Sequence, residues 1–144
     1  MGLLFSVLAG AAMSFQGVIN TRLGEKIGVY ESNVFAQGTA LVLGAIAWML
    51  LGKGDFGKLG SASPVYWLGG VLGLVITVAV MLAIGNLSPL YATSIILVTQ
   101  LVTSACIEAF GLLGTVQVPF SWSKWLGMAL MVGGILLFQW QQKG

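Results

Sequence analysis

The residues best suited to chemistry lie in one apolar stretch, Tyr91–Leu113, which is long enough to cross a bilayer. On an α-helix its polar residues share one stripe about 80° wide, formed by Thr93, Gln100, Ser104 and Glu108. A carboxylate in hydrocarbon costs roughly 2.5 kcal/mol or more, so a sequence keeps one where it meets a partner, a water-filled cavity or a substrate. The stripe is therefore the main indication of function in the sequence.

The composition indicates an integral membrane protein. Of the 144 residues, 58% are hydrophobic and only 7% are charged, whereas about 25% of the residues in a soluble domain are charged. The chain has no histidine, and its one cysteine, Cys106, cannot form an intrachain disulfide. The net charge of +2 is too small to indicate a nucleic-acid partner. No nucleophile–base pair, phosphate loop or metal cluster is recognisable, so we expect no catalytic residues, no metal site and no cofactor.

The fold class predicted from the apolar runs is all-α, with five transmembrane helices. Each run has roughly 20 residues, the length needed to cross ~30 Å of hydrocarbon. We expect a single five-helix membrane domain over residues 1–144, with helices near 3–21, 32–51, 65–84, 91–113 and 123–139. Between the first two helices, the segment Arg22–Glu31 is predicted to be a connecting loop with turns at Gly24 and Gly28. Ser32 is then expected to cap the second helix.

Neutral amides mark the first two helices. Each amide offers hydrogen-bond donors and acceptors and is suited to lining a substrate cavity. Each is equally suited to cross-linking helices, which contributes only about 0.6 kcal/mol on average. Both interpretations stay open at this point. The full candidate site for substrate or proton binding is Glu108, Gln100, Ser104, Gln16, Asn20, Asn33 and Gln37.

Glu108 also has two interpretations. It lies about six residues from the expected helix centre, or roughly 9 Å from the membrane midplane, inside a half-thickness of about 15 Å. In the first interpretation its carboxylate faces a translocation cavity and binds a proton or a cation. In the second it makes a structural hydrogen bond, or pairs with Lys124 at the interface. In an antiparallel dimer the two copies of Glu108 are expected on opposite sides of the midplane, as separate entrance groups.

The basic residues do not select one orientation in the membrane. Loops on the N-terminal side and loops on the other side carry three each, namely Lys53, Lys58 and Lys124 against Arg22, Lys26 and Lys143. Orientation normally follows an excess of Lys and Arg in short cytoplasmic loops. Balanced charge with an odd number of spans predicts a dual-topology protein that inserts both ways and pairs antiparallel. The alternative is a single topology set by the first helix.

Three runs of the sequence carry a family resemblance: MSFQGVINTRLG (Met13–Gly24), WLGGVLG (Trp67–Gly73) and ILVTQLVTSACIEAFGLLG (Ile96–Gly114). They resemble the short YdcZ-type inner-membrane exporters of the drug/metabolite transporter superfamily, over essentially the whole chain. The resemblance implies one half of a ten-helix inverted-repeat transporter in a bacterial inner membrane, completed by a second copy or a paralogous half. The family pattern favours an aspartate where this chain has Glu108.

Residues and resemblance together predict a small secondary transporter that exports small organic metabolites or drugs. We expect alternating access in an antiparallel homodimer, with protonation of Glu108 as the candidate coupling step. The expected partners are a second copy of the chain or a paralogous half, membrane lipids and a small-molecule substrate. Two other functions stay open: a flippase for lipid-linked substrates, and a non-transporting membrane scaffold or regulatory subunit.

Overall fold

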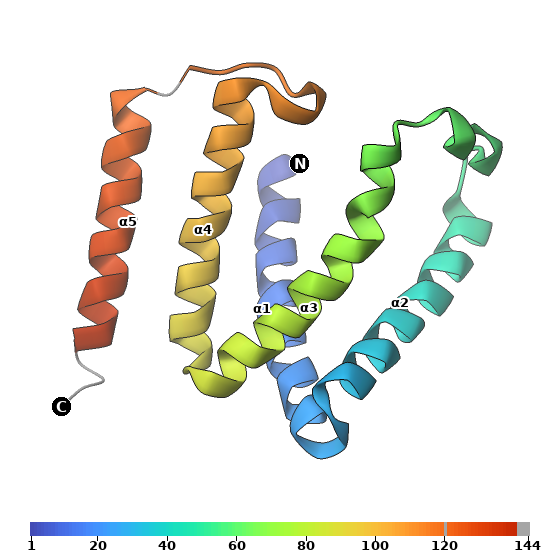
Figure 1. The fold of residues 1–144 in the computed structure, drawn as a ribbon, viewed down its shortest axis with the longest axis horizontal. Coiled ribbons are helices and arrows are strands. Elements are labelled where there is room, and N and C mark those ends of the chain that lie inside the picture. Colours follow the sequence, from blue (N-terminus) through green and yellow to red (C-terminus); the bar gives the residue numbers. More distant parts are fainter. Residues whose placement is uncertain (120, 141–144) are drawn as a thin grey trace. The chain divides into compact units, whose positions relative to one another are not determined.

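The computed structural model describes residues 1–119 and 121–140, and all regular secondary structure within these ranges is helical. The side chains of Phe138 and Gln139, and the basic residue Lys143 of the charge count, lie outside the described residues. The α-helices are α1 (Gly2–Ile27), α2 (Val29–Leu51), α3 (Gly69–Asn86), α4 (Pro89–Phe110) and α5 (Trp122–Trp140) (Figure 1). Short 3-10 helices at Phe56–Ser61 and Pro64–Leu68 connect α2 to α3, and a third follows α4 at Leu112–Gly114.

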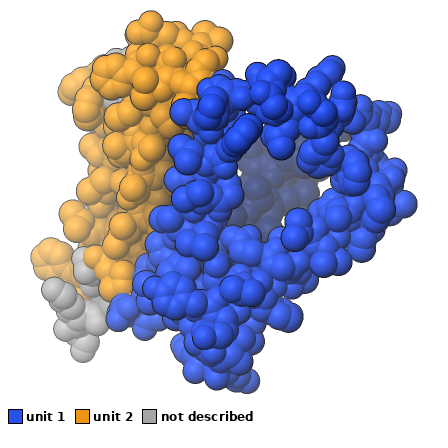
Figure 2. All heavy atoms as spheres, turned by 45° about the vertical axis from the view of Figure 1, so that its right-hand side comes forward, with its two compact units in different colours: residues 1–86 blue, residues 87–144 orange. Residues whose placement is uncertain are grey.

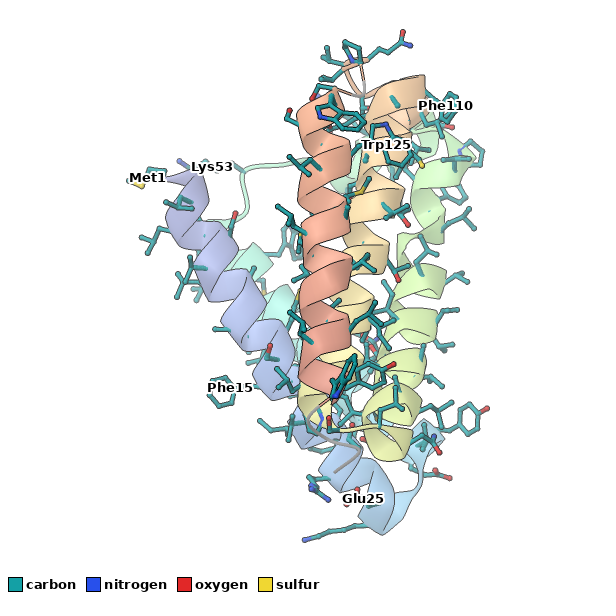
Figure 3. The ribbon with its side chains drawn as sticks, turned by 90° about the vertical axis from the view of Figure 1, so that its left-hand side faces the viewer. Met1, Phe15, Glu25, Lys53, Phe110 and Trp125 are labelled. Carbon is teal, nitrogen blue, oxygen red and sulfur yellow. The ribbon has the colours of Figure 1, made fainter. Side chains whose placement is uncertain are left out.

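The helices have the length and surface expected of membrane spans. Among the described residues, four segments are long and apolar enough to cross a bilayer: Gly2–Ile27, Val29–Leu51, Pro64–Asn86 and Pro89–Phe110. The apolar part of α5, Trp122–Leu137, is shorter. Large apolar side chains face outward along these helices, as Phe15 does at 71% exposure (Figure 3). The prediction of an all-helical membrane protein is confirmed.

The chain forms two compact units, residues 1–86 and residues 87–144 (Figure 2). In the first unit α1 packs against both α2 and α3, and one face of the unit is hollowed (Figure 2). Helix α1 approaches α3 closely at Gly17, where an added Cβ would lie 2.9 Å from Ile84 Cδ1. The buried positions of this unit lie toward the ends of the helices nearest Gly28 and Asn86: Gly17, Asn20, Thr21, Gly24, Ser32, Asn33, Met81 and Ile84.

The turn between α1 and α2 differs from the prediction. Helix α1 continues to Ile27, and Gly28 alone separates it from α2, so the predicted loop at Arg22–Glu31 is wrong. Gly28 adopts φ 105° and ψ 148°, a region that is essentially restricted to glycine. Gly24 is not a turn residue but lies where α1 meets α2, with an added Cβ 3.5 Å from Val29 Cα.

The expected N-cap of α2 is also wrong. The helix begins three residues before Ser32, and the backbone N–H of Ser32 already donates to the carbonyl of Gly28 at 3.0 Å. The Ser32 hydroxyl instead donates across to the carbonyl of Asn20 in α1 at 2.9 Å. Ser32 is completely buried, so it joins two helices and does not cap one.

In residues 87–144, α4 packs against α5. Helix α4 begins after Ser88, whose hydroxyl accepts from the N–H of Tyr91 at 3.3 Å, and Pro89 occupies its first turn. It ends at Phe110, where Gly111 takes the left-handed conformation with φ 61°. This end lies three residues before the expected one, because Gly111 stops the helix.

Replacing Gly28 by alanine is expected to destabilise the first unit. The Gly28→Ala change forces a side chain into a glycine conformation, at a cost of about 1–3 kcal/mol, and its Cβ would meet the carboxylate of Glu31. Thermal unfolding of the purified protein in detergent measures the effect. Gly38→Ala is the matched control, because an added Cβ at this helical position has no neighbour within 4 Å. Equal melting temperatures for the two variants would contradict the single-residue turn.

Candidate functional site

The segment after α4 folds back and caps the carboxyl end of that helix. A helix leaves its last four carbonyls without partners inside the helix. Here the carbonyl of Glu108 accepts from the N–H groups of Gly111 at 3.3 Å and Val118 at 3.0 Å. The Thr115 hydroxyl donates to the carbonyl of Ile107 at 3.3 Å, and the Gln117 amide donates to that of Ala109 at 3.0 Å. This cap returns the chain to α4, and α5 begins a few residues later.

As a result, the first turn of α5 reaches the last turn of α4. Lys124 Nζ lies 3.2 Å from Glu108 Oε2 and donates a hydrogen bond to it. The Lys124 side chain is 35% exposed and that of Glu108 is 47% exposed, so the pair is open on one side. Pairing of Glu108 with Lys124, one of the two interpretations of this carboxylate, is therefore present in the structure. A proton- or cation-binding role for Glu108 stays a prediction.

The depth expected for Glu108 needs correction. Because α4 spans Pro89–Phe110, Glu108 lies about 13 Å along the axis from the helix centre, and not roughly 9 Å. That distance approaches the half-thickness of about 15 Å of a hydrocarbon core. The carboxylate is thus close to one end of the span, where water reaches it more easily and where pairing with a lysine at a helix end is natural.

A groove runs along α4 and α5 from this ion pair. Its volume is about 300 Å³, at the lower end of the range of ligand sites. Glu108 and Lys124 are its charged residues, and Ser104 is its hydroxyl. The remaining lining is apolar: Leu101, Ala105, Gly127, Met128 and Met131.

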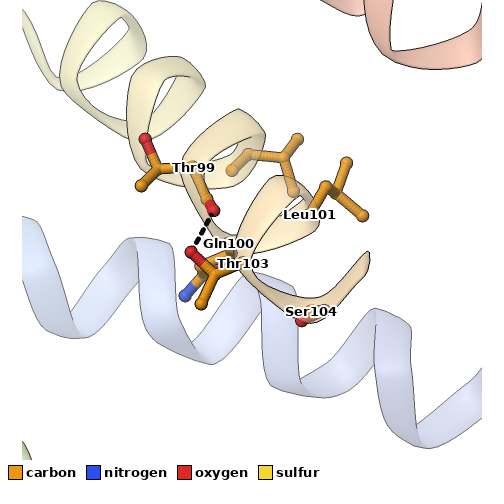
Figure 4. Close-up of a pocket in the computed structure, with 6 residues that line it drawn as sticks. Thr99, Gln100, Leu101, Thr103 and Ser104 are labelled. Atoms are coloured by element: carbon orange, nitrogen blue, oxygen red, sulfur yellow. Dashed lines mark hydrogen bonds between the residues drawn. The ribbon is translucent and has the colours of Figure 1, made fainter. Parts of the chain in front are cut away.

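A second, more open cavity lies on α4 beside the groove. Its volume is about 500 Å³, and Gln100 and Ser104 contribute to its lining (Figure 4). The hydroxyls of Thr99 and Thr103 donate back to the carbonyls of Ile95 and Thr99, at 2.9 and 2.8 Å. Ser104 lines both cavities. Of the predicted stripe, Gln100 and Ser104 thus share one cavity and Ser104 and Glu108 share the other, while Thr93 lines neither of them.

The amides of α1 and α2 gather around a residue of α3. Gln16 and Asn20 line a cavity of about 50 Å³ that Thr77 also lines, and Gln37 Nε2 donates to Thr77 Oγ1 at 3.5 Å. Thr77 Oγ1 in turn donates to the carbonyl of Gly73 at 2.9 Å. Thr77 was missing from the candidate site, although a lone polar residue in an otherwise apolar helix could have identified it.

Asn33 differs from the other amides because it belongs to the core. It is 4% exposed, and its Oδ1 atom has no hydrogen-bond partner among the described residues. The residue before it, Ser32, donates to the carbonyl of Asn20. The structure therefore places the seven predicted residues in two groups. Gln16, Asn20, Asn33 and Gln37 lie in residues 1–86, and Gln100, Ser104 and Glu108 lie in residues 87–144.

A comparison with known protein families identifies the family of this chain. The model of the DMT_YdcZ family, described as "Putative inner membrane exporter, YdcZ", matches residues 1–137. The chain belongs to the YdcZ family. No curated protein and no solved structure matches it. The family predicted from the three sequence runs is confirmed, and this YdcZ-family member is a multi-pass protein of the inner membrane. The description of the family names a membrane exporter, which is a transporter rather than an enzyme.

Removing the Ser32 hydroxyl is expected to weaken the packing of α1 on α2. The Ser32→Ala variant loses a fully buried hydrogen bond to Asn20, which is worth about 1 kcal/mol. The matched control is Ser14→Ala, because the exposed Ser14 hydroxyl donates only within its own helix, to Gly10. Thermal unfolding in detergent should give a lower midpoint for Ser32→Ala than for the control. A midpoint equal to that of Ser14→Ala would show that this hydrogen bond does not stabilise the unit.

Proposed function

We propose that this YdcZ-family protein is a secondary transporter that exports small organic molecules by alternating access. The supporting observation is the placement of polar side chains in the spanning helices. Gln16 and Asn20 line a cavity in the first unit, and the strip formed by Gln100, Ser104 and Glu108 lines cavities in the second. Polar groups inside membrane segments are costly and usually face a bundle interior or a water-filled path.

The proposed working unit contains two copies of the chain, or one copy and a paralogous half, in antiparallel orientation. Gln16 and Gln100 are exposed in the single chain although both lie within spanning helices. An amide without hydrogen bonds in hydrocarbon is unfavourable, and a second copy that covers these amides would reduce that cost. The balanced Lys and Arg count is consistent with insertion in both orientations. Such a pair forms a ten-helix inverted repeat, an arrangement that typically frames a binding site near the midplane.

In this proposal one half rocks against the other around the bound substrate. Gln16, Asn20, Gln37 and Gln100 contact the substrate as neutral donors and acceptors, while Asn33 supports the helices from the core. Glu108 lies nearer to one membrane surface. Protonation of its carboxylate removes the attraction for Lys124, which loosens a contact between α4 and α5. A proton can then shift the balance between two helix arrangements, as coupling to a gradient requires.

Proton-coupled export should depend on Glu108. Proteoliposomes loaded with a mixture of cationic, neutral and anionic metabolites are given an inward proton gradient, and solute loss is measured by mass spectrometry. We expect the wild type to lose at least one solute. Glu108→Gln should slow that loss by about tenfold, within the usual range of coupling between two binding events.

The control for this experiment is Glu25→Gln, which removes an exposed carboxylate paired with Arg22 at the end of α1 and should leave the flux unchanged. Equal gradient-driven loss from Glu108→Gln and the wild type would remove the coupling role. Absence of any solute loss from the wild type would contradict the exporter proposal itself.

Dual topology is tested by labelling single cysteines from each side of intact cells. Gly54 and Gly60 lie in the exposed connector between α2 and α3 and have no neighbour within 4 Å of an added Cβ, so cysteine should fit there. In a Cys106→Ser background, an impermeant maleimide should label both positions from either side of the membrane. A cysteine at Leu43, within the span of α2, should resist the reagent. Labelling of the connector from one side only would show a single topology.

A further inference from the structure

The groove between α4 and α5 contains a feature that the exporter proposal uses only for coupling, namely an ammonium group already bound to its carboxylate. Glu108 is the one acidic residue of residues 87–144. Its partner Lys124 is attached to α5 by a long and flexible stem, and both side chains are partly exposed. An exposed ion pair of this kind contributes little stability and opens easily. The carboxylate is therefore available to any cation that can replace the lysine.

The positions of Glu108 and Lys124 at helix ends favour replacement of the lysine by a free cation. Glu108 lies in the last turn of α4, and Lys124 lies in the first turn of α5. The carboxyl end of a helix carries partial negative charge, which disfavours a carboxylate and attracts a cation. The amino end carries partial positive charge, which disfavours a lysine ammonium. A free cation placed against Glu108 gains the attraction of α4 without the repulsion that Lys124 experiences from α5.

The shape and lining of the groove describe the rest of the ligand. From the ion pair the groove continues past Ser104 between small residues and two thioethers, Met128 and Met131. Methionine side chains are flexible and polarisable, and they adapt to apolar groups of different shape. A volume of about 300 Å³ accommodates a compact molecule with a single charge at one end and an apolar body.

We propose that the α4–α5 groove binds a monovalent organic cation with an apolar body, whose charge replaces the Lys124 ammonium at Glu108. Lys124 acts as a tethered competitor: it neutralises Glu108 in the empty groove and swings toward water when a cation enters. The exchange conserves the charge next to the carboxylate, so Glu108 is never left unpaired. Lys124 is thus a specificity-determining residue, because a cation binds only if its affinity for Glu108 exceeds that of the lysine. This inference rests on the proposed exporter function, because the bound cation would be the exported substrate. Cation binding itself can be measured without transport.

The test is calorimetric titration of the full-length protein in nonionic detergent with benzyltrimethylammonium. Its uncharged isostere, neopentylbenzene, and the anion phenylmethanesulfonate serve as matched probes. We expect the wild type to bind the cation and to bind neither of the other two probes as tightly. Lys124→Gln should strengthen cation binding by about two- to fivefold, the gain expected from removing an exposed ion pair. Glu108→Gln should abolish it, while Glu108→Asp, which keeps the charge, should retain it.

Lys53→Gln is the control for a general loss of positive charge, because Lys53 lies in the connector of the first unit, and it should not change the affinity. Circular dichroism of each variant verifies folding, and Glu108→Asp supports the conclusion if Glu108→Gln does not fold. Weaker cation binding by Lys124→Gln would overturn the proposal. So would a wild type that binds phenylmethanesulfonate and a Lys124→Gln variant that does not. Cation binding that is unchanged in Glu108→Gln would overturn it as well. Failure of solute flux with intact cation binding would contradict only the exporter function.

Discussion

The structure depends on one constraint: backbone polar groups in hydrocarbon must find partners within the protein. Helices meet this requirement along their length, but each helix end leaves carbonyls or N–H groups exposed. At the end of α4 the chain meets it by folding residues 115–118 back onto Ile107, Glu108 and Ala109. The same fold-back places the start of α5 beside α4. The segment that caps the carbonyls of α4 therefore also brings Lys124 to Glu108.

The two units use their polar residues in different ways. In residues 1–86 the buried hydroxyl of Ser32 and the amides around Thr77 are neutral and connect helices to one another. In residues 87–144 the polar strip of α4 opens onto cavities and ends in a charged pair. Neutral groups tolerate a low-dielectric interior when they are hydrogen-bonded, whereas a charge needs a counter-charge or water. The division therefore separates neutral groups, which are suited to polar contacts, from a charged pair, which is suited to contacts with another charge.

This contrast also orders the candidate residues by what they can do. Asn33 is nearly inaccessible, so any influence on a ligand must act through the packing of α1 and α2. Gln16 and Gln100 are exposed on their helices and need a second chain, or water, to complete their hydrogen bonds. Glu108 already has a partner, because Lys124 donates to its Oε2 atom, so a cation that binds this oxygen must compete with the lysine.

The sequence by itself determined the helical membrane class and the family, because apolar runs of about 20 residues have few other stable states. It also identified the polar stripe of α4, since helical periodicity places Gln100, Ser104 and Glu108 together without any tertiary contact. Tertiary structure alone decided the single-residue turn at Gly28, the hydrogen bond of Ser32 to Asn20, the cluster at Thr77 and the pairing of Glu108 with Lys124. These features join residues on different helices, and the approach of two helices depends on side-chain packing that no local pattern encodes.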